Sequence, residues 1–184
     1  MSAPEIWLVA GPNGAGKTSL ARRALALRLG ADLEILNPDE RTLRRLKAAG
    51  YACFADAPDA ALRSSCLAGA REAVDEVRSR GGHAFLPHVG LASPEISARR
   101  VAARVQLGGQ GVPPDRLAER WNRSLARLGW FAARAREFWP YDNSAEAPAR
   151  EPALAAWGAG GLVRFAAGVP AYFQQALAGL TRAD

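Results

Sequence analysis

Cysteine and histidine are scarce in this chain, and their scarcity excludes several kinds of site. The sequence holds two cysteines, Cys53 and Cys66, and two histidines, His83 and His88. The cysteines are too few and too far apart for a zinc knuckle or a Cys-x-x-Cys redox pair, so we expect reduced thiols. The histidines share a strand-like run at a spacing that points them to opposite faces, so we expect structural roles for both.

Long apolar runs are missing as well. No stretch approaches the ~20 residues that a membrane helix needs, and the N-terminus lacks a charged-then-apolar signal pattern. We therefore expect a cytoplasmic protein that does not contact a membrane. Neither an internal repeat nor a long linker divides the 184 residues, so we expect one domain over residues 1–184.

The charge is unbalanced, with a net value of +6 and only two lysines, Lys17 and Lys47, among 24 basic residues. Such a balance invites a nucleic-acid partner. The arginines, however, are dispersed along an Ala- and Leu-rich chain, and dispersed charge favours that partner only weakly. We do not expect nucleic acid as the main partner, because a site for polyphosphate ligands would account for part of the excess.

The strongest pattern lies near the N-terminus, where an apolar run at 6–10 leads into a glycine-rich loop and then into a helix-forming segment at 18–29. The loop reads Gly11-Pro12-Asn13-Gly14-Ala15-Gly16-Lys17-Thr18 and is followed by Ser19. This is G-x-x-x-x-G-K-[ST] in the strand–loop–helix context of a phosphate loop. Glycines let backbone N–H groups turn around an anion, and the helix N-terminus adds partial positive charge. We expect these residues to bind ATP, with Lys17 on the phosphates and Thr18 on Mg²⁺.

The rest of the chain alternates strand and helix patterns. We expect strands at 33–36 and 83–91 and another strand ending at 142–144. Because Pro87 interrupts the run at 83–91, we expect that this run is either not a regular strand or lies at a sheet edge. We expect helices at 41–49, 58–80, 93–107, 114–128 and 170–180. Strands alternating with helices behind a phosphate loop predict an α/β fold of the P-loop NTPase or kinase type, with three layers and a mainly parallel sheet.

Phosphoryl transfer also needs a group that orients the acceptor and positive charge over the moving phosphoryl group. Asp39 follows the expected strand at 33–36, where open α/β sheets gather ligands. Its carboxylate can accept a proton from a hydroxyl or hold Mg²⁺ through water, and it can equally be a helix N-cap.

Four arginines fall nearly in line on the expected helix 114–128, opposite its apolar face: Arg116, Arg120, Arg123 and Arg127. Arg120 or Arg123 suits the role of an arginine finger, because the planar guanidinium binds phosphate oxygens bidentately. A solvated surface explains the row equally well. On the preceding helix Arg100 and Arg104 are weaker candidates for the same role, and we expect them to form a solvated face instead.

With these residues assembled, the chain resembles the zeta-toxin-like family of phosphate-loop kinases. The matching segments are 10–18, Asn-Pro-Asp at 37–39, Ser-Pro-Glu at 93–95, the Arg-Val pairs at 100–101 and 104–105, Gly-Gly-x-x-Val-Pro at 108–113, Arg-x-x-Arg-Ser-Leu at 120–125 and Tyr-Asp-Asn-Ser at 141–144. The resemblance implies transfer of the ATP γ-phosphoryl group to a hydroxyl of a small acceptor, UDP-N-acetylglucosamine in the toxin members, with an antitoxin-like protein as a further partner. Carried over by position, it implies that Lys17 and Thr18 handle phosphate and metal, that Asp39 is the general base, and that Arg120, with Arg123 as a second candidate, contacts the γ-phosphate.

The chain departs from the family pattern in one region. Members usually carry a Glu-Thr-x-Leu-Ser-like signature within a strand–helix unit before Ser-Pro-Glu, whereas here residues 85–91 join the two ends directly and no Glu-Thr pair exists. Because that signature helps to hold the acceptor, a second hypothesis stays open, a nucleotide-binding regulatory module without efficient kinase activity. A third hypothesis, nucleic-acid binding or a nucleic-acid kinase, rests on the charge and the arginine row.

Overall fold

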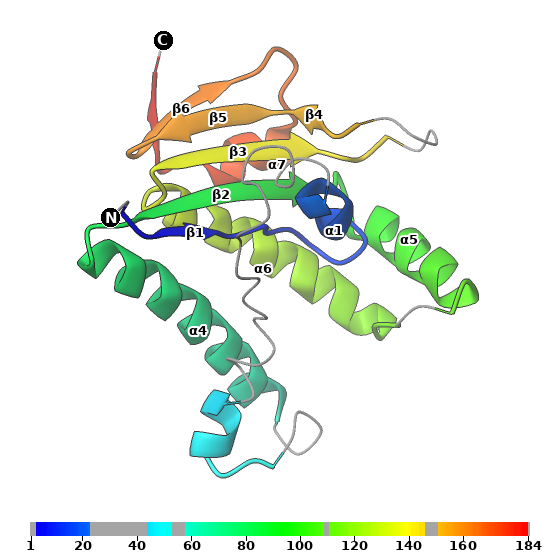
Figure 1. Ribbon diagram of the computed structural model, residues 1–184. Helices are drawn as coiled ribbons and strands as arrows, with labels where there is room; N and C mark the ends of the chain where they lie inside the picture. The colour runs from blue at the N-terminus through cyan, green and yellow to red at the C-terminus, as the bar shows by residue number, and fades with distance from the viewer. Residues whose placement is uncertain (1–2, 23–43, 53–57, 109–110, 146–150, 184) are drawn as a thin grey trace. The chain divides into compact units, whose positions relative to one another are not determined.

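The computed structural model describes residues 3–22, 44–52, 58–108, 111–145 and 151–183 (Figure 1). The strand expected at 33–36 and the candidate base Asp39 lie outside the described residues. The chain divides into two compact units, of which the first holds described residues 3–6, 44–52 and 58–83, and the second holds the other described residues. The α/β class expected from the sequence is confirmed. The single domain expected over 1–184 stays a prediction.

In the first unit the main element is helix α4, Asp59–Ser79, which begins after Pro58 in an extended conformation, as the expected helix at 58–80 requires. Residues 44–48 are helical too, and the chain leaves that turn at Gly50 with a φ of 90°. Leu46 is fully buried and Val74 is 1% exposed. An ion pair joins Arg45 to Glu72 of α4.

The described strands form a mixed sheet in the order β1-β2-β3-β5-β6-β7, with β4 paired to β3, and all of its residues except Glu5, Ile6 and His83 belong to the second unit. The strands are β1 Glu5–Trp7, β2 His83–Gly90, β3 Glu137–Asp142, β4 Ala153–Leu154, β5 Ala156–Ala159, β6 Leu162–Phe165 and β7 Thr181–Arg182. β1, β2 and β3 are mutually parallel, and β7 is parallel to β6. β4 and β5 are antiparallel to β3, and β6 is antiparallel to β5, so most of the described strands run in one direction.

The expectation that Pro87 either demotes its strand or places it at a sheet edge is wrong, because β2 is a regular strand from His83 to Gly90. β2 lies between β1 and β3. The amides of Leu8 and Ala10 donate to the carbonyls of Phe85 and Pro87 at 2.8 and 2.9 Å, so Pro87 still serves the ladder as an acceptor. Its missing N–H falls opposite Leu8, just where β1 ends at Trp7, and pairing resumes as a bridge from Ala10 to His88. The ladder is thus interrupted for one step rather than ended.

Helices α5 and α6 of the second unit begin within one residue of the expected positions. α5, Pro94–Gln106, begins after Ser93, and α6, Pro114–Ala132, begins after Pro113 and extends one turn beyond the expected end at 128. The C-terminal helix α7 is shorter than expected, Ala171–Ala176, and a turn leads from it to β7. The chain reverses between β5 and β6 at Gly160 and Gly161, with φ values of 57° and 86°.

The core of the second unit lies between the sheet and helices α6 and α7 (Figure 1). Its larger members are Leu86, Leu125, Leu128, Phe138, Val163, Phe173 and Leu177. Burying a side chain of this size stabilises the fold by roughly 1.5–3 kcal/mol. Because β2 and β3 both contribute to this core, the carboxyl ends of the parallel strands are held in place beside the glycine-rich loop. Among the described residues, no helix combines the length and apolar character that crossing a bilayer requires.

Candidate functional site

The glycine-rich loop, residues 11–16, joins the end of the β1 segment to helix α1, Lys17–Leu20. Gly11, Gly14 and Gly16 have φ values of 140°, 73° and 91°, which side chains rarely tolerate. A Cβ atom on Gly11 would lie 2.1 Å from the carbonyl oxygen of Val89. The glycines are therefore required by this backbone path along the carboxyl ends of the parallel strands, where α/β sheets bind ligands.

Lys17 closes the loop on itself. Its Nζ atom donates hydrogen bonds to the carbonyl oxygens of Gly11 at 2.9 Å and Pro12 at 2.8 Å. The ammonium group thus lies against the loop it follows. Both bonds go to neutral carbonyls, so a polyphosphate would offer the same ammonium a stronger, charge-assisted partner.

Two further loop carbonyls are held from neighbouring elements. The hydroxyl of Ser97 on α5 donates to the carbonyl of Asn13 at 2.6 Å, and the amide Nδ2 of Asn143, just after β3, donates to the carbonyl of Ala15 at 2.9 Å. In a trans peptide the C=O and the next N–H point in opposite directions. The amides that follow these two carbonyls are therefore turned away from α5 and from Asn143, as an anion-binding nest requires.

Positive charge gathers at the loop from three elements. The pKa of Lys17 is lowered to about 8, by burial first and then by the charges of Arg104 on α5 and Arg120 on α6. An anion placed among these cations would relieve their repulsion and return the pKa of Lys17 toward its ordinary value. Arg120 therefore lies near enough to Lys17 to act on its charge, and its contact with a γ-phosphate stays a prediction. Arg104 is exposed, as expected, yet its charge also acts on Lys17, so the candidate that the sequence ranked lower does lie near the loop.

The other expected arginines have different surroundings. Arg123 is half-buried and lies 3.4 Å from Glu119, one turn earlier on α6, so part of its charge is already matched. Arg100 donates to the carbonyl of Ala145 at 2.9 Å and so fixes the chain after β3. Thr18 and Ser19 are exposed at the start of α1, where their hydroxyls are accessible.

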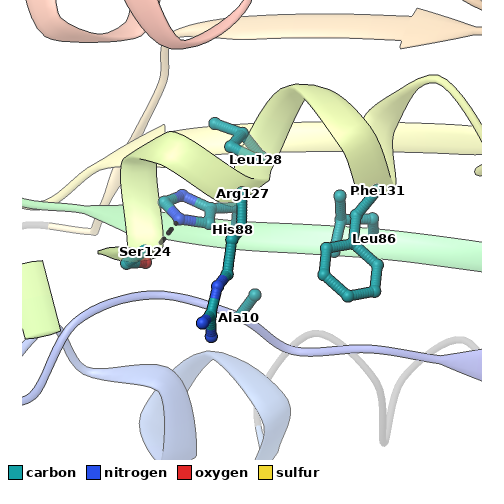
Figure 2. A pocket seen from close by; sticks show the side chains of 7 residues that line it. All are labelled: Ala10, Leu86, His88, Ser124, Arg127, Leu128 and Phe131. Atoms are coloured by element: carbon teal, nitrogen blue, oxygen red, sulfur yellow. Dashed lines mark hydrogen bonds between the residues drawn. The ribbon is translucent and has the colours of Figure 1, made fainter. Parts of the chain in front are cut away.

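A small pocket of about 120 Å³ lies between β2 and α6, and Figure 2 shows the side chains that line it. His88 forms part of its wall, is 1% exposed, and has its Nε2 atom 3.1 Å from the hydroxyl of Ser124 on α6. Its Nδ1 atom has no hydrogen-bond partner among the described residues. Burial, followed by the charge of Lys17, lowers the pKa of His88 to about 3, so the imidazole is neutral at physiological pH. This agrees with the structural role expected for His88.

The turn after β3 carries site residues to which the sequence assigned no role. Asp142 Oδ1 accepts hydrogen bonds from the hydroxyl of Tyr172 on α7 at 2.8 Å, from the backbone amide of Ser144 at 3.1 Å, and from the Ser144 hydroxyl. Ser144 Oγ also accepts the amide of Ala92 at 2.7 Å. Their place at the carboxyl end of an expected strand could have marked residues 142–144 as candidate site residues, because α/β sheets bind ligands there.

The described residues fit a polyphosphate better than a metal bound by protein alone. No group of three or more His, Cys, Asp or Glu side chains that could hold a metal ion occurs in the described ranges. Mg²⁺ commonly takes one or two protein oxygens together with substrate phosphates and waters, and the Thr18 hydroxyl could be one of those oxygens.

Comparison of the chain with protein-family models, with curated proteins and with solved structures finds no match.

Proposed function

We propose that this protein is an ATP- and Mg²⁺-dependent phosphotransferase of the zeta-toxin-like kind, with a phosphate-loop kinase fold. The observation that carries the proposal is the gathering of Lys17, Arg104 and Arg120 beside a glycine loop of positive φ. Three cations from separate elements, one of them with a lowered pKa, are an arrangement suited to a polyanionic ligand.

Each described residue then has a defined task. The loop amides would cradle the phosphates, Lys17 would leave the carbonyls of Gly11 and Pro12 for a phosphate oxygen, and Arg120 would balance the charge that develops during transfer. Bound Mg·ATP would supply the phosphoryl group and neutralise part of its charge, with Thr18 as the protein ligand to the metal.

The acceptor side of the proposal rests on the sequence resemblance. Asp39 is proposed as the general base that takes the proton of an acceptor hydroxyl, and a UDP-sugar such as UDP-N-acetylglucosamine is the proposed acceptor class. An antitoxin-like protein partner and a cytoplasmic location belong to the same proposal.

A second candidate is a nucleotide-binding regulatory module without efficient transfer. The observation that favours it is the absence of any Glu-Thr pair, the signature with which relatives hold the acceptor. This candidate shares the nucleotide site and differs only in turnover.

Mass spectrometry of the purified protein with Mg·ATP and a pool of nucleotide sugars and metabolites separates the two candidates. A kinase yields a product heavier by one phosphoryl group with the wild type and none with Lys17→Ala. Asp39→Asn should abolish transfer while ATP binding is kept, and wild-type turnover in that variant would remove Asp39 as the base. ATP binding without any phosphorylated product would favour the regulatory module.

A further inference from the structure

The hydrogen bond from Asn143 to Ala15 connects the turn after β3 directly to the phosphate loop. The amide Nδ2 of Asn143 donates to the Ala15 carbonyl at 2.9 Å, and a Cβ atom on Gly16 would lie 3.0 Å from the same nitrogen. The backbone of Asn143 is held in turn by the carbonyl of Gly90, at 3.1 Å from its amide. Because the Ala15 carbonyl points toward Asn143, the Gly16 amide in that peptide unit points away from it.

Helix α7 reaches the same turn through Tyr172. Its hydroxyl donates to Asp142 at 2.8 Å, and its ring lies 6.5 Å from that of Trp121, whose indole N–H donates to the carbonyl of Leu91 at 2.8 Å. The approach of α7 to the strand end is close, since a Cβ atom on Gly90 would lie 2.9 Å from the Tyr172 ring. Tyr172 is thus fixed both by its ring and by its hydroxyl.

We propose that Asn143 and Tyr172 are positioning residues for the phosphate loop, so that the C-terminal helix helps to set polyphosphate affinity. Asn143 turns the Ala15 carbonyl outward and thereby directs the Gly16 amide toward the anion. Tyr172 fixes the carboxylate of Asp142 and, through it, the turn that carries Asn143. The inference rests on the proposed nucleotide site and names two residues outside the loop that shape it.

A positioning role has a different signature from a packing role. If Asn143 and Tyr172 act on the loop amides, their loss should lower the affinity for ATP and for inorganic tripolyphosphate by the same factor. The phosphate chain is the part that these two ligands have in common. Losing one oriented hydrogen bond should raise Kd roughly 5- to 10-fold. Because Tyr172 is proposed to act through Asn143, the double variant should lose no more affinity for either ligand than Asn143→Ala alone.

The experiment is calorimetric titration of Mg·ATP and of tripolyphosphate into the wild type, Asn143→Ala, Tyr172→Phe and the double variant, with thermal unfolding of each recorded alongside. Tyr172→Phe keeps the ring and removes only the hydroxyl, so it remains informative if Asn143→Ala fails to fold. The matched controls are Asn122→Ala, at an exposed position of α6, and Tyr51→Phe, in the first unit. Both should bind as the wild type does.

The outcomes separate the two levels of the proposal. Parallel losses for both ligands, with no additivity in the double variant, support the positioning role. Wild-type affinity in Asn143→Ala and Tyr172→Phe overturns the positioning role and leaves the nucleotide site standing. Additive losses overturn the series linkage of Tyr172 to Asn143. If the wild type binds neither ligand, the proposed function itself fails.

Discussion

The hydroxyl of Ser97 donates a 2.6 Å hydrogen bond to the carbonyl oxygen of Asn13, 84 positions earlier in the chain. Ser97 is fully buried in the first turns of α5, and its own carbonyl lies so near Gly14 that a Cβ atom there would approach it to 3.1 Å. One residue of α5 therefore both holds the loop by its side chain and limits the loop by its backbone. The start of α5 is in this sense part of the candidate site.

Ser97→Ala should weaken polyphosphate binding with a modest loss of stability. Removing the hydroxyl leaves the Asn13 carbonyl without this donor, which typically costs about 1–3 kcal/mol when the group is buried. Calorimetry should show Kd for Mg·ATP raised roughly 5- to 10-fold. The matched control is Ser79→Ala, which removes a 2.8 Å bond from an exposed serine to the carbonyl of Glu76 in the first unit and should leave Kd unchanged. Equal Kd values for the wild type and Ser97→Ala would contradict this role.

ATP affinity should fall as pH rises through about 8. Lys17 has a pKa lowered to about 8 in the free protein, and a bound anion raises that pKa, so binding is accompanied by proton uptake above pH 8. Kd measured between pH 7.5 and 9.5 should rise by up to about tenfold per pH unit. Lys17→Arg stays protonated over this range and should show no such slope. The same slope in both proteins would show that another group is responsible.

Arg120→Ala and Arg123→Ala should differ sharply, although the two residues lie one turn apart on α6. Arg120 acts on Lys17, whereas Arg123 is matched by Glu119 at 3.4 Å. If Arg120 balances the transferring phosphoryl group, its loss should lower kcat by roughly 10³-fold, while Arg123→Ala should change kcat by no more than about threefold. Arg120→Ala should also move the pH dependence of ATP binding to higher pH, because one cation beside Lys17 is gone. Equal effects of the two substitutions would contradict the assignment.

Local signals predicted much of the fold. Ser93-Pro94 locates the start of α5, and Pro114 locates the start of α6. These residues act on their own backbone, so their effect can be predicted without knowing the neighbouring elements. Pro87 did not predict an edge strand correctly. The effect of its missing N–H depends on which residue of the neighbouring strand lies opposite it, and the sequence of β2 alone does not reveal that neighbour.

The sequence predicted the glycine-rich loop of the candidate site, but not the residues of other elements that hold the loop in place. Lys17 and the glycines carry a local pattern, and Arg120 belongs to a helical row that the 3.6-residue period reveals. Asn143 reaches Ala15 across 128 positions, and Tyr172 reaches Asp142 across 30, so no periodicity connects them. Arg104 looked like a surface residue and is exposed, and only the approach of α5 to the loop gives it an electrostatic role. Tertiary contacts, not local propensities, assemble this part of the site.

Gly11→Ala should be the most damaging single-methyl change in the loop. Gly11 has a φ of 140°, and an added Cβ would lie 2.1 Å from the carbonyl oxygen of Val89 on β2, which is paired on both sides, so β2 would have to move. Backbone strain of this kind costs of order 1–3 kcal/mol even before the clash is relieved. Urea unfolding should therefore show a free energy of unfolding lower by at least about 3 kcal/mol, with ATP binding lost where the protein still folds.

The control for this change is Gly160→Ala in the turn between β5 and β6. Gly160 also has a positive φ, 57°, but an added Cβ would meet nothing within 4 Å, so the substitution carries backbone strain alone. It should lower the free energy of unfolding by only about 1–2 kcal/mol and leave Kd for Mg·ATP unchanged. Equal stability of Gly11→Ala and Gly160→Ala would contradict the close approach of Gly11 to the carbonyl of Val89. The excess loss of stability at Gly11 therefore measures how tightly the glycine-rich loop is held against β2.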